Sequence, residues 1–136
     1  MIGEIIDILE ADSTVMGMLN NSNANIHAVQ RHQETTLPCV VVDLTNFEPQ
    51  ETKSHSSFID FVTIQVAAYT QDPKSSYELA LAIRNELDKY VGSVNHHHLD
   101  IRFEDLEVGL VAEDESFATV TTFVVTHQRT GQASHT

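Results

Sequence analysis

A long alternating segment that passes directly into one amphipathic helix constrains this fold more than any other feature of the chain. From Phe58 to Tyr69, apolar and β-branched side chains occupy both alternating faces, as is typical of a strand covered on its two sides. The strand pattern breaks at Asp72-Pro73, and helical spacing follows. The apolar positions of this helix are Ala80, Ile83, Leu87 and Tyr90. The segment is therefore a strand joined to a helix that packs on it.

The ends of this helix carry recognisable capping residues. Ser75, with Glu78 three positions later, predicts a capping box at the start of the helix. Gly92 predicts a C-terminal cap, because glycine readily adopts the left-handed conformation found there. No residue of the segment resembles a reactive centre, so its pattern indicates packing rather than catalysis.

The remaining apolar segments predict further helices and strands. The spacing within 2–9 predicts a helix, and Asp12-Ser13-Thr14 predicts its end and the cap of a second, short helix. Segments 26–29, 40–44 and 117–127 have the composition of strands. Between 99 and 110 the apolar phase shifts by one residue, which predicts a bulge near Glu104-Asp105. We expect a single α+β domain over residues 1–128, with an antiparallel sheet of about four strands and helices packed on one face. A polar tail, 129–136, is expected to be disordered.

Composition limits the class of protein. The chain has 136 residues, the usual size of one domain, and no apolar run long enough to cross a bilayer. Its acidic start differs from a secretory signal, so we expect synthesis in the cytoplasm. Cys39, the single cysteine, lies in an apolar run and is expected to be a small buried side chain.

The charge balance bears on nucleic-acid binding. Seven basic and 20 acidic residues give a net charge of −13, which argues against binding through phosphate neutralisation. An acidic wall could still let DNA pass without adhering to it. Plain solubility is the simpler interpretation of the same charge.

Candidate chemical sites are few. His96, His97 and His98 are consecutive, and in an extended segment only alternate side chains share a face, so a polar strand entry is favoured over a metal site. The paired carboxylates lie in expected turns and loops. We therefore expect no catalytic residue, no cofactor and no metal, with a small metal- or ligand-binding domain as the alternative.

Two segments are candidates for contacts with other proteins. The polar stretch 47–57 is predicted to be a long hairpin excursion between two strands, and loops of this length are often functional. The final strand is apolar or β-branched on both faces, and this short chain can cover only one of them. Another copy of the chain is the natural cover for the second face, although a threonine-rich solvent face is the alternative. The candidate interface residues are Val120, Thr122, Val124 and Thr126.

The order of these segments resembles the tail completion, or tail terminator, proteins of long-tailed bacteriophages. The matching segments are DSTVMGML, IHAV, LPCVVVDL, FVTIQVAAYTQD, SYELALAIRNELDKY and TTFVVTHQR, which together span nearly the whole chain. A bulky aromatic residue would fit the family pattern better than Cys39, and the three histidines are not part of that pattern. The resemblance rests on apolar segments and their lengths rather than on a catalytic signature.

The resemblance implies a structural virion protein rather than an enzyme. Members of this family assemble into a ring, commonly a hexamer, at the head-proximal end of the tail. The ring stops growth of the tail tube and meets the head connector, and DNA crosses its channel. The implied partners are sister copies, the tube protein and the connector, without a membrane or sequence-specific DNA binding. The expected docking residues are Glu48, Gln50, Lys53 and His55. Another connector or tube protein of the phage neck is the alternative.

Overall fold

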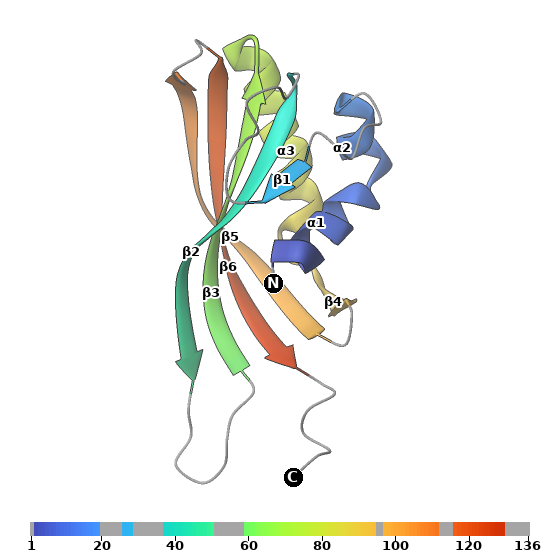
Figure 1. Ribbon diagram of the computed structural model, residues 1–136, viewed down its shortest axis with the longest axis vertical. Helices are drawn as coiled ribbons and strands as arrows, with labels where there is room; N and C mark the ends of the chain where they lie inside the picture. The colour runs from blue at the N-terminus through green and yellow to red at the C-terminus, as the bar shows by residue number, and fades with distance from the viewer. Residues whose placement is uncertain are drawn as a thin grey trace, which may run out of the picture.

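A computed structural model describes residues 2–19, 26–28, 37–50, 59–94, 97–111 and 116–129 (Figure 1). Its helices are α1 (Ile2–Glu10), α2 (Ser13–Met18) and α3 (Pro73–Leu87). Its strands are β1 (Ile26–Ala28), β2 (Cys39–Gln50), β3 (Ile59–Thr70), β4 (Val91–Val94), β5 (His97–Val111) and β6 (Phe117–Arg129). Helices and strands form separate layers, as the sequence predicts.

The strands form one six-stranded sheet in the order β1-β2-β3-β6-β5-β4. β1 runs parallel to β2, whereas the other neighbouring strands are antiparallel. The expected antiparallel sheet of four strands is therefore wrong, because the sheet is larger and mixed. β1 corresponds to the strand predicted at 26–29, whereas β4, four residues long, is too short for alternation to reveal it.

The C-terminal end of α3 also differs from the prediction. The helix ends at Leu87, and Lys89 adopts the left-handed conformation with φ 65°, which non-glycine residues take infrequently. The chain reverses there, so Gly92 lies in β4 instead of capping the helix. Tyr90 packs against the core from outside the helix.

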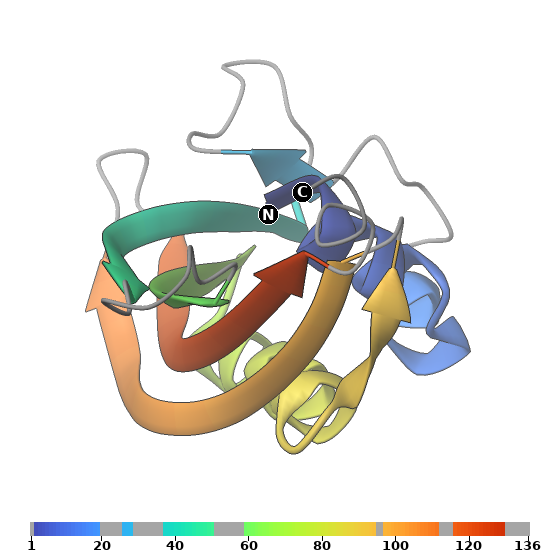
Figure 2. The ribbon, with the colours of Figure 1, turned by 90° about the horizontal axis from the view of Figure 1, so that it is seen from below.

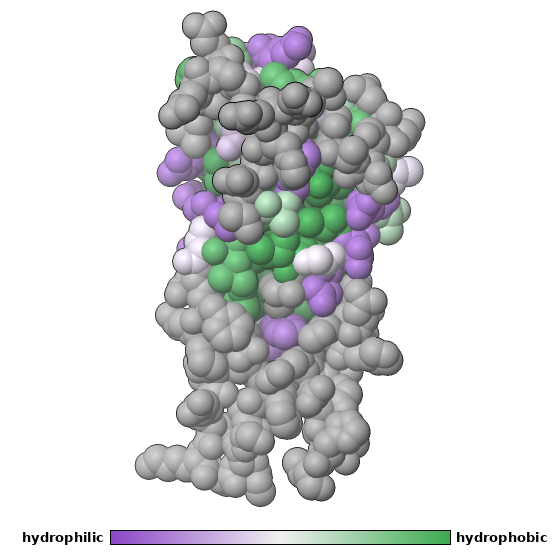
Figure 3. Space-filling model, in the orientation of Figure 1, coloured by the Kyte–Doolittle hydropathy of each residue, from purple (hydrophilic) through white to green (hydrophobic). Residues whose placement is uncertain are grey.

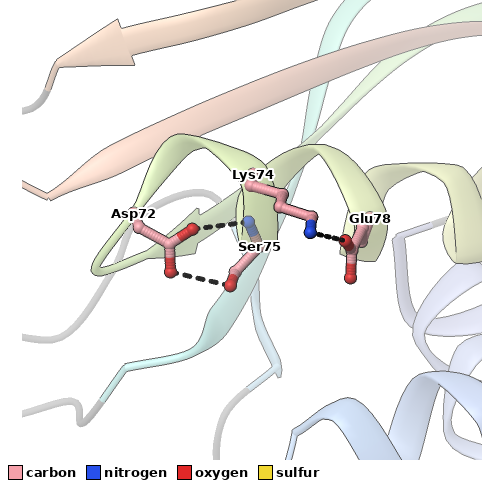
Figure 4. Close-up of polar contacts among 4 residues, drawn as sticks. All are labelled: Asp72, Lys74, Ser75 and Glu78. Atoms are coloured by element: carbon pink, nitrogen blue, oxygen red, sulfur yellow. Dashed lines mark hydrogen bonds and ion pairs between the residues drawn. The ribbon is translucent and has the colours of Figure 1, made fainter.

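Asp72 caps the start of α3 in place of the predicted Ser75 (Figure 4). One carboxylate oxygen of Asp72 accepts the Ser75 backbone N–H at 2.9 Å, and the other accepts the Ser75 hydroxyl at 2.7 Å. Pro73 occupies the first helical turn, where its fixed φ suits the helix. Glu78 pairs with Lys74 at 3.9 Å rather than closing a capping box. The N-cap of the helix therefore lies three residues earlier than predicted.

The hydrophobic core lies between the helices and one face of the sheet. The helices α1 and α3 contribute Ile5, Ile8, Leu9, Leu79, Ala80, Ile83 and Leu87. The central strands β3 and β6 contribute Val62, Ile64, Val66, Ala68, Phe123 and Val125. Their alternation confirms the predicted phase of both strands. Cys39 is fully buried, as expected, but is not part of this cluster.

The long strands bend and twist along their length. Figure 1 shows them crossing near mid-length, and Figure 2 shows the strong curl of the sheet. The register of β5 against β6 shifts between Phe103 and Asp105, which confirms the predicted bulge. A second shift lies between Glu107 and Leu110, where Gly109 has φ 81°. Bulges increase local twist, and these two lie in the half of β5 that continues beyond β4.

No helix among the described residues is long and apolar enough to cross a membrane.

Candidate assembly surface

The face of the sheet that points away from the core is uncharged along its two central strands. The register of β3 against β6 pairs Phe61 with Thr126, Thr63 with Val124, Gln65 with Thr122, Ala67 with Val120, and Tyr69 with Ala118. We call these residues the central stripe. Strand geometry sets the stripe, because alternate residues of each strand point to the same face.

The central stripe has no part in the cluster that joins helices to sheet. That cluster takes the alternate residues of β3 and β6 and none from the stripe. Phe123 and Val125 are 0% exposed, whereas Val124 and Thr126 beside them are half-buried. Phe61 is 38% exposed, an uncommon state for a side chain of its size. The described helices therefore cover one face of the central strands and leave the stripe accessible.

Charged side chains flank the central stripe. Asp43 on β2 pairs with Gln65, and Asp105 on β5 pairs with Thr122. Arg102 of β5 donates a hydrogen bond from Nε to Asp100 at 2.9 Å, and this contact raises the pKa of the guanidinium. An uncharged centre with a charged border is the usual anatomy of a protein–protein interface.

The four predicted interface residues all lie on this face. Val120, Thr122, Val124 and Thr126 occupy successive positions of the stripe on β6 and are half-buried. That they contact a sister copy stays a prediction. The β3 half of the stripe was not predicted as an interface. The apolar and β-branched side chains on both faces of β3 were the signal that could have indicated it.

The predicted docking residues do not form one described loop. Glu48 and Gln50 belong to the end of β2, where their backbones pair with Phe61 and Ile59. The predicted excursion is therefore wrong for 47–50, because strand pairing extends to Gln50. Lys53 and His55 lie outside the described residues.

The histidine cluster begins β5. His97 and His98 pair with Val94 and Ser93 of β4, as a polar strand entry should, whereas His96 lies outside the described residues. Within the described ranges, no group of His, Cys, Asp and Glu could hold a metal ion.

The predicted disordered tail, 129–136, begins one residue too early, because Arg129 is the last residue of β6. Residues 130–136 lie outside the described residues.

An open cleft of about 280 Å³ lies at the start of α3. Asp72, on its wall, has a pKa below the ordinary value because it accepts hydrogen bonds from the backbone and hydroxyl of Ser75. The ionised carboxylate is thus committed to capping the helix. These hydrogen bonds favour the ionised form of Asp72, which suits a helix cap rather than a proton donor.

A second carboxyl group is perturbed on the helix side. Burial raises the pKa of Glu86 on α3, and the nearby carboxylate and hydrogen bond of Asp12 raise it further. Asp12 also caps α2 by accepting the Val15 N–H at 3.0 Å. This carboxyl pair joins the start of α2 to the surface of α3.

Apolar side chains also gather over α1 and the neighbouring stretch of β2 (Figure 3). Ile2, Ile6 and Leu44 are partly buried there against the core. This area belongs to the helix layer and continues the core outward, unlike the central stripe.

Comparison with known proteins gives a match in structure alone. No family model and no curated protein matches the sequence. Among solved structures, a chain of the virion of a native gene transfer agent particle has a similar fold, with a TM-score of 0.69. The match covers 93% of this chain and 92% of that chain, at 11% sequence identity. The two chains therefore share a fold over nearly their full lengths.

Proposed function

We propose that this protein is a structural component of a phage-like virion that forms a ring, commonly of six copies, at the head-proximal end of the tail. The ring terminates the tail tube, joins it to the head connector and lets DNA pass. The observation that carries this proposal is the full-length similarity in fold to a chain of the gene transfer agent virion. The order of apolar segments in the sequence supports it independently.

The central stripe supplies a surface for ring formation. A chain with a net charge of −13 repels its own copies over most of its surface. The stripe combines apolar, threonine and glutamine side chains without a charge, so two copies can approach there at the least electrostatic cost. Burial of Phe61, Val120 and Val124 then contributes the hydrophobic stabilisation. The proposed function is assembly, and it requires no catalytic residue.

The connection between β2 and β3 is the proposed docking arm to the neighbouring component of the virion. Glu48 and Gln50 stand at the end of β2, and Lys53 and His55 follow in the chain. Deleting residues 51–54 should leave ring formation intact and prevent joining of tails to heads. Normal joining by this deletion variant would contradict the arm assignment.

The first experiment measures the mass of the purified protein and images it by negative stain. Rings of several subunits are expected, and antibody labelling of particles should mark the junction of head and tail. A compact single subunit at high concentration, unchanged when tail tubes are added, would contradict the proposal.

A tube protein or another connector of the neck is the second candidate, because such proteins also assemble through repeated surfaces. Mixing the purified protein with growing tubes separates these roles. A terminator halts elongation and remains at one end, whereas a tube protein is incorporated along the length.

A small ligand-binding domain is the remaining alternative. It predicts a stable monomer that binds Zn²⁺ through the histidines that begin β5. Zinc titration of the purified protein should show no binding above background if the assembly role is correct.

A further inference from the structure

The outer edge of β5 is only partly paired. β4 pairs with β5 from His97 to Asp100. Beyond it, the backbone of Ile101 exchanges hydrogen bonds with Lys89 and Tyr90, at 2.8 and 2.9 Å, and Phe103 N–H donates to the Asp88 carboxylate at 2.9 Å. From there to Val111, no described strand pairs with this edge. An open edge of this kind is a template for an added strand.

The backbone groups at the open edge can be assigned from the register. Ile101 and Phe103 direct their N–H groups outward, away from β6. After the bulge, Asp105 and Glu107 oppose Thr122 and Val120 of β6. Leu106 lies between these two inward residues and therefore directs its backbone groups outward. Val108 follows the inward Glu107 at the start of the second register shift, and we assign its backbone groups the same outward direction. These two residues can therefore hydrogen-bond an incoming strand without disturbing the pairs with β6.

The side chains along this edge are acidic and apolar. Glu104, Asp105 and Glu107 are exposed, and Val108 and Val111 are 51% and 66% exposed. The neighbouring Arg102 is already engaged by Asp100. A strand that approaches this edge therefore meets three carboxylates, and a basic strand with apolar side chains complements them.

A second copy of this chain does not supply such a strand. Its seven basic residues are spread so that no two lie within four positions of each other. A copy also carries the same net charge of −13, which repels it from an acidic edge. The partner at this edge is thus chemically different from the chain itself, in contrast to the partner expected at the central stripe.

We propose that the edge of β5 from Glu104 to Val111 binds an extended basic segment of a different protein by strand addition. Backbone hydrogen bonds to Leu106 and Val108 hold the segment in register, and its Lys or Arg side chains pair with Glu104, Asp105 and Glu107. Main-chain pairing provides the affinity, and the alternating charges select the partner. This proposal depends on the geometry of the edge and not on the ring.

The test uses the full chain and a short peptide in which lysine alternates with threonine. Binding is followed through the backbone amides by NMR, and hydrogen exchange at Leu106 and Val108 should slow in the complex. Val108→Pro removes one outward N–H at an exposed position and should weaken binding about tenfold relative to Val108→Thr, which keeps the N–H. Added salt should weaken binding further.

Three controls can overturn the proposal. A peptide with glutamate in place of lysine should not bind, and equal binding of both peptides would exclude charge selection. Equal affinity of Val108→Pro and Val108→Thr would exclude strand addition. If Val108→Pro lowered the mass of the native assembly, the edge would bind a second copy instead. Mass is measured in parallel, so failure of the ring proposal is seen separately from failure of peptide binding.

Discussion

The two faces of β6 belong to one strand but meet different surroundings. Phe123 and Val125 point into the core and are 0% exposed, whereas Val124 and Thr126 point to the opposite face and are half-buried. The first pair contacts side chains of the helix layer, and the second belongs to the uncharged central stripe. One face therefore stabilises the domain, and the other remains available for assembly.

Similar residues therefore have different roles on the two faces of β6. Full burial of a valine or phenylalanine side chain contributes about 1.5–3 kcal/mol, so the covered face supplies much of the folding free energy. Half-buried residues of the stripe gain further burial only from a partner. Substitutions on the two faces should therefore affect different measurements, namely unfolding on one face and mass on the other.

The largest expected effect is the contrast between Phe123→Ala and Val124→Ala. Phe123→Ala leaves a cavity in the core and should lower the free energy of unfolding by about 3–5 kcal/mol. Val124→Ala should cost less than about 1 kcal/mol when both variants are compared as single subunits. Urea unfolding measures both values. Similar losses of unfolding free energy from the two substitutions would contradict the assignment of one face to the core and the other to assembly.

A smaller effect is expected from the hydroxyl pair that fixes α3 on the sheet. Ser76 and Thr119 are buried, and their hydroxyl oxygens lie 2.9 Å apart. Ser76 also donates to the Pro73 carbonyl at 2.9 Å, so Thr119 is the donor within the pair. Ser76→Ala should lower the free energy of unfolding by about 1–3 kcal/mol, because it leaves the buried Thr119 hydroxyl without its acceptor.

A double-mutant cycle isolates this contact. Thr119→Val combined with Ser76→Ala should cost less than the sum of the single substitutions, with a coupling energy of about 0.5–3 kcal/mol. Strict additivity in urea unfolding would mean that the hydroxyl pair does not hold the helix layer.

The smallest effect concerns the pH dependence of the helix layer. Burial first, and Asp12 second, raise the pKa of Glu86 above its ordinary value of 4.5. The folded state therefore binds this proton more tightly than the unfolded state, and its contribution to stability is lost as pH rises from 4.5 through the raised pKa. Glu86→Gln should raise the unfolding midpoint at neutral pH and change it little at low pH. A midpoint gain that was equal at both pH values would contradict the assignment.

The long strands and the alternation of their faces could be predicted from the sequence. Val62, Ile64, Val66 and Ala68 lie in the core as their spacing indicated, because period-two patterning directly reflects the pleat. The shift of phase near Glu104 likewise corresponds to a bulge in the register. The four predicted stripe residues of β6 were found by the same reasoning.

The short strand β4 and the two ends of α3 could not be predicted in this way. β4 is four residues long and pairs with the start of β5, and so short a segment shows no alternation of its own, whereas the segment of β1 was predicted as a strand. Ser75 had the pattern of a cap, but Asp72 before Pro73 provides two acceptor contacts to that same residue. Lys89 takes the left-handed position that glycine usually occupies, so Gly92 was a misleading signal.

The acidic edge of β5 was missed for a related reason. Its role depends on where β4 stops pairing, at Asp100, and not on the residues of β5 alone. Glu104, Asp105 and Glu107 lie among apolar residues, and this mixture was a local signal of an exposed strand. Only the sheet order shows that this stretch lies at an open edge.

The most direct test of the account is the mass of Val124→Glu beside that of Val124→Thr and the native chain. A carboxylate in the middle of the central stripe would be buried without a partner when copies meet, whereas threonine preserves the shape and neutrality of the site. We expect the native chain and Val124→Thr to form the same multi-subunit species, and Val124→Glu to remain a folded single subunit. A native chain that is a single subunit, or a Val124→Glu variant with the native mass, would contradict the claim that copies meet at this face.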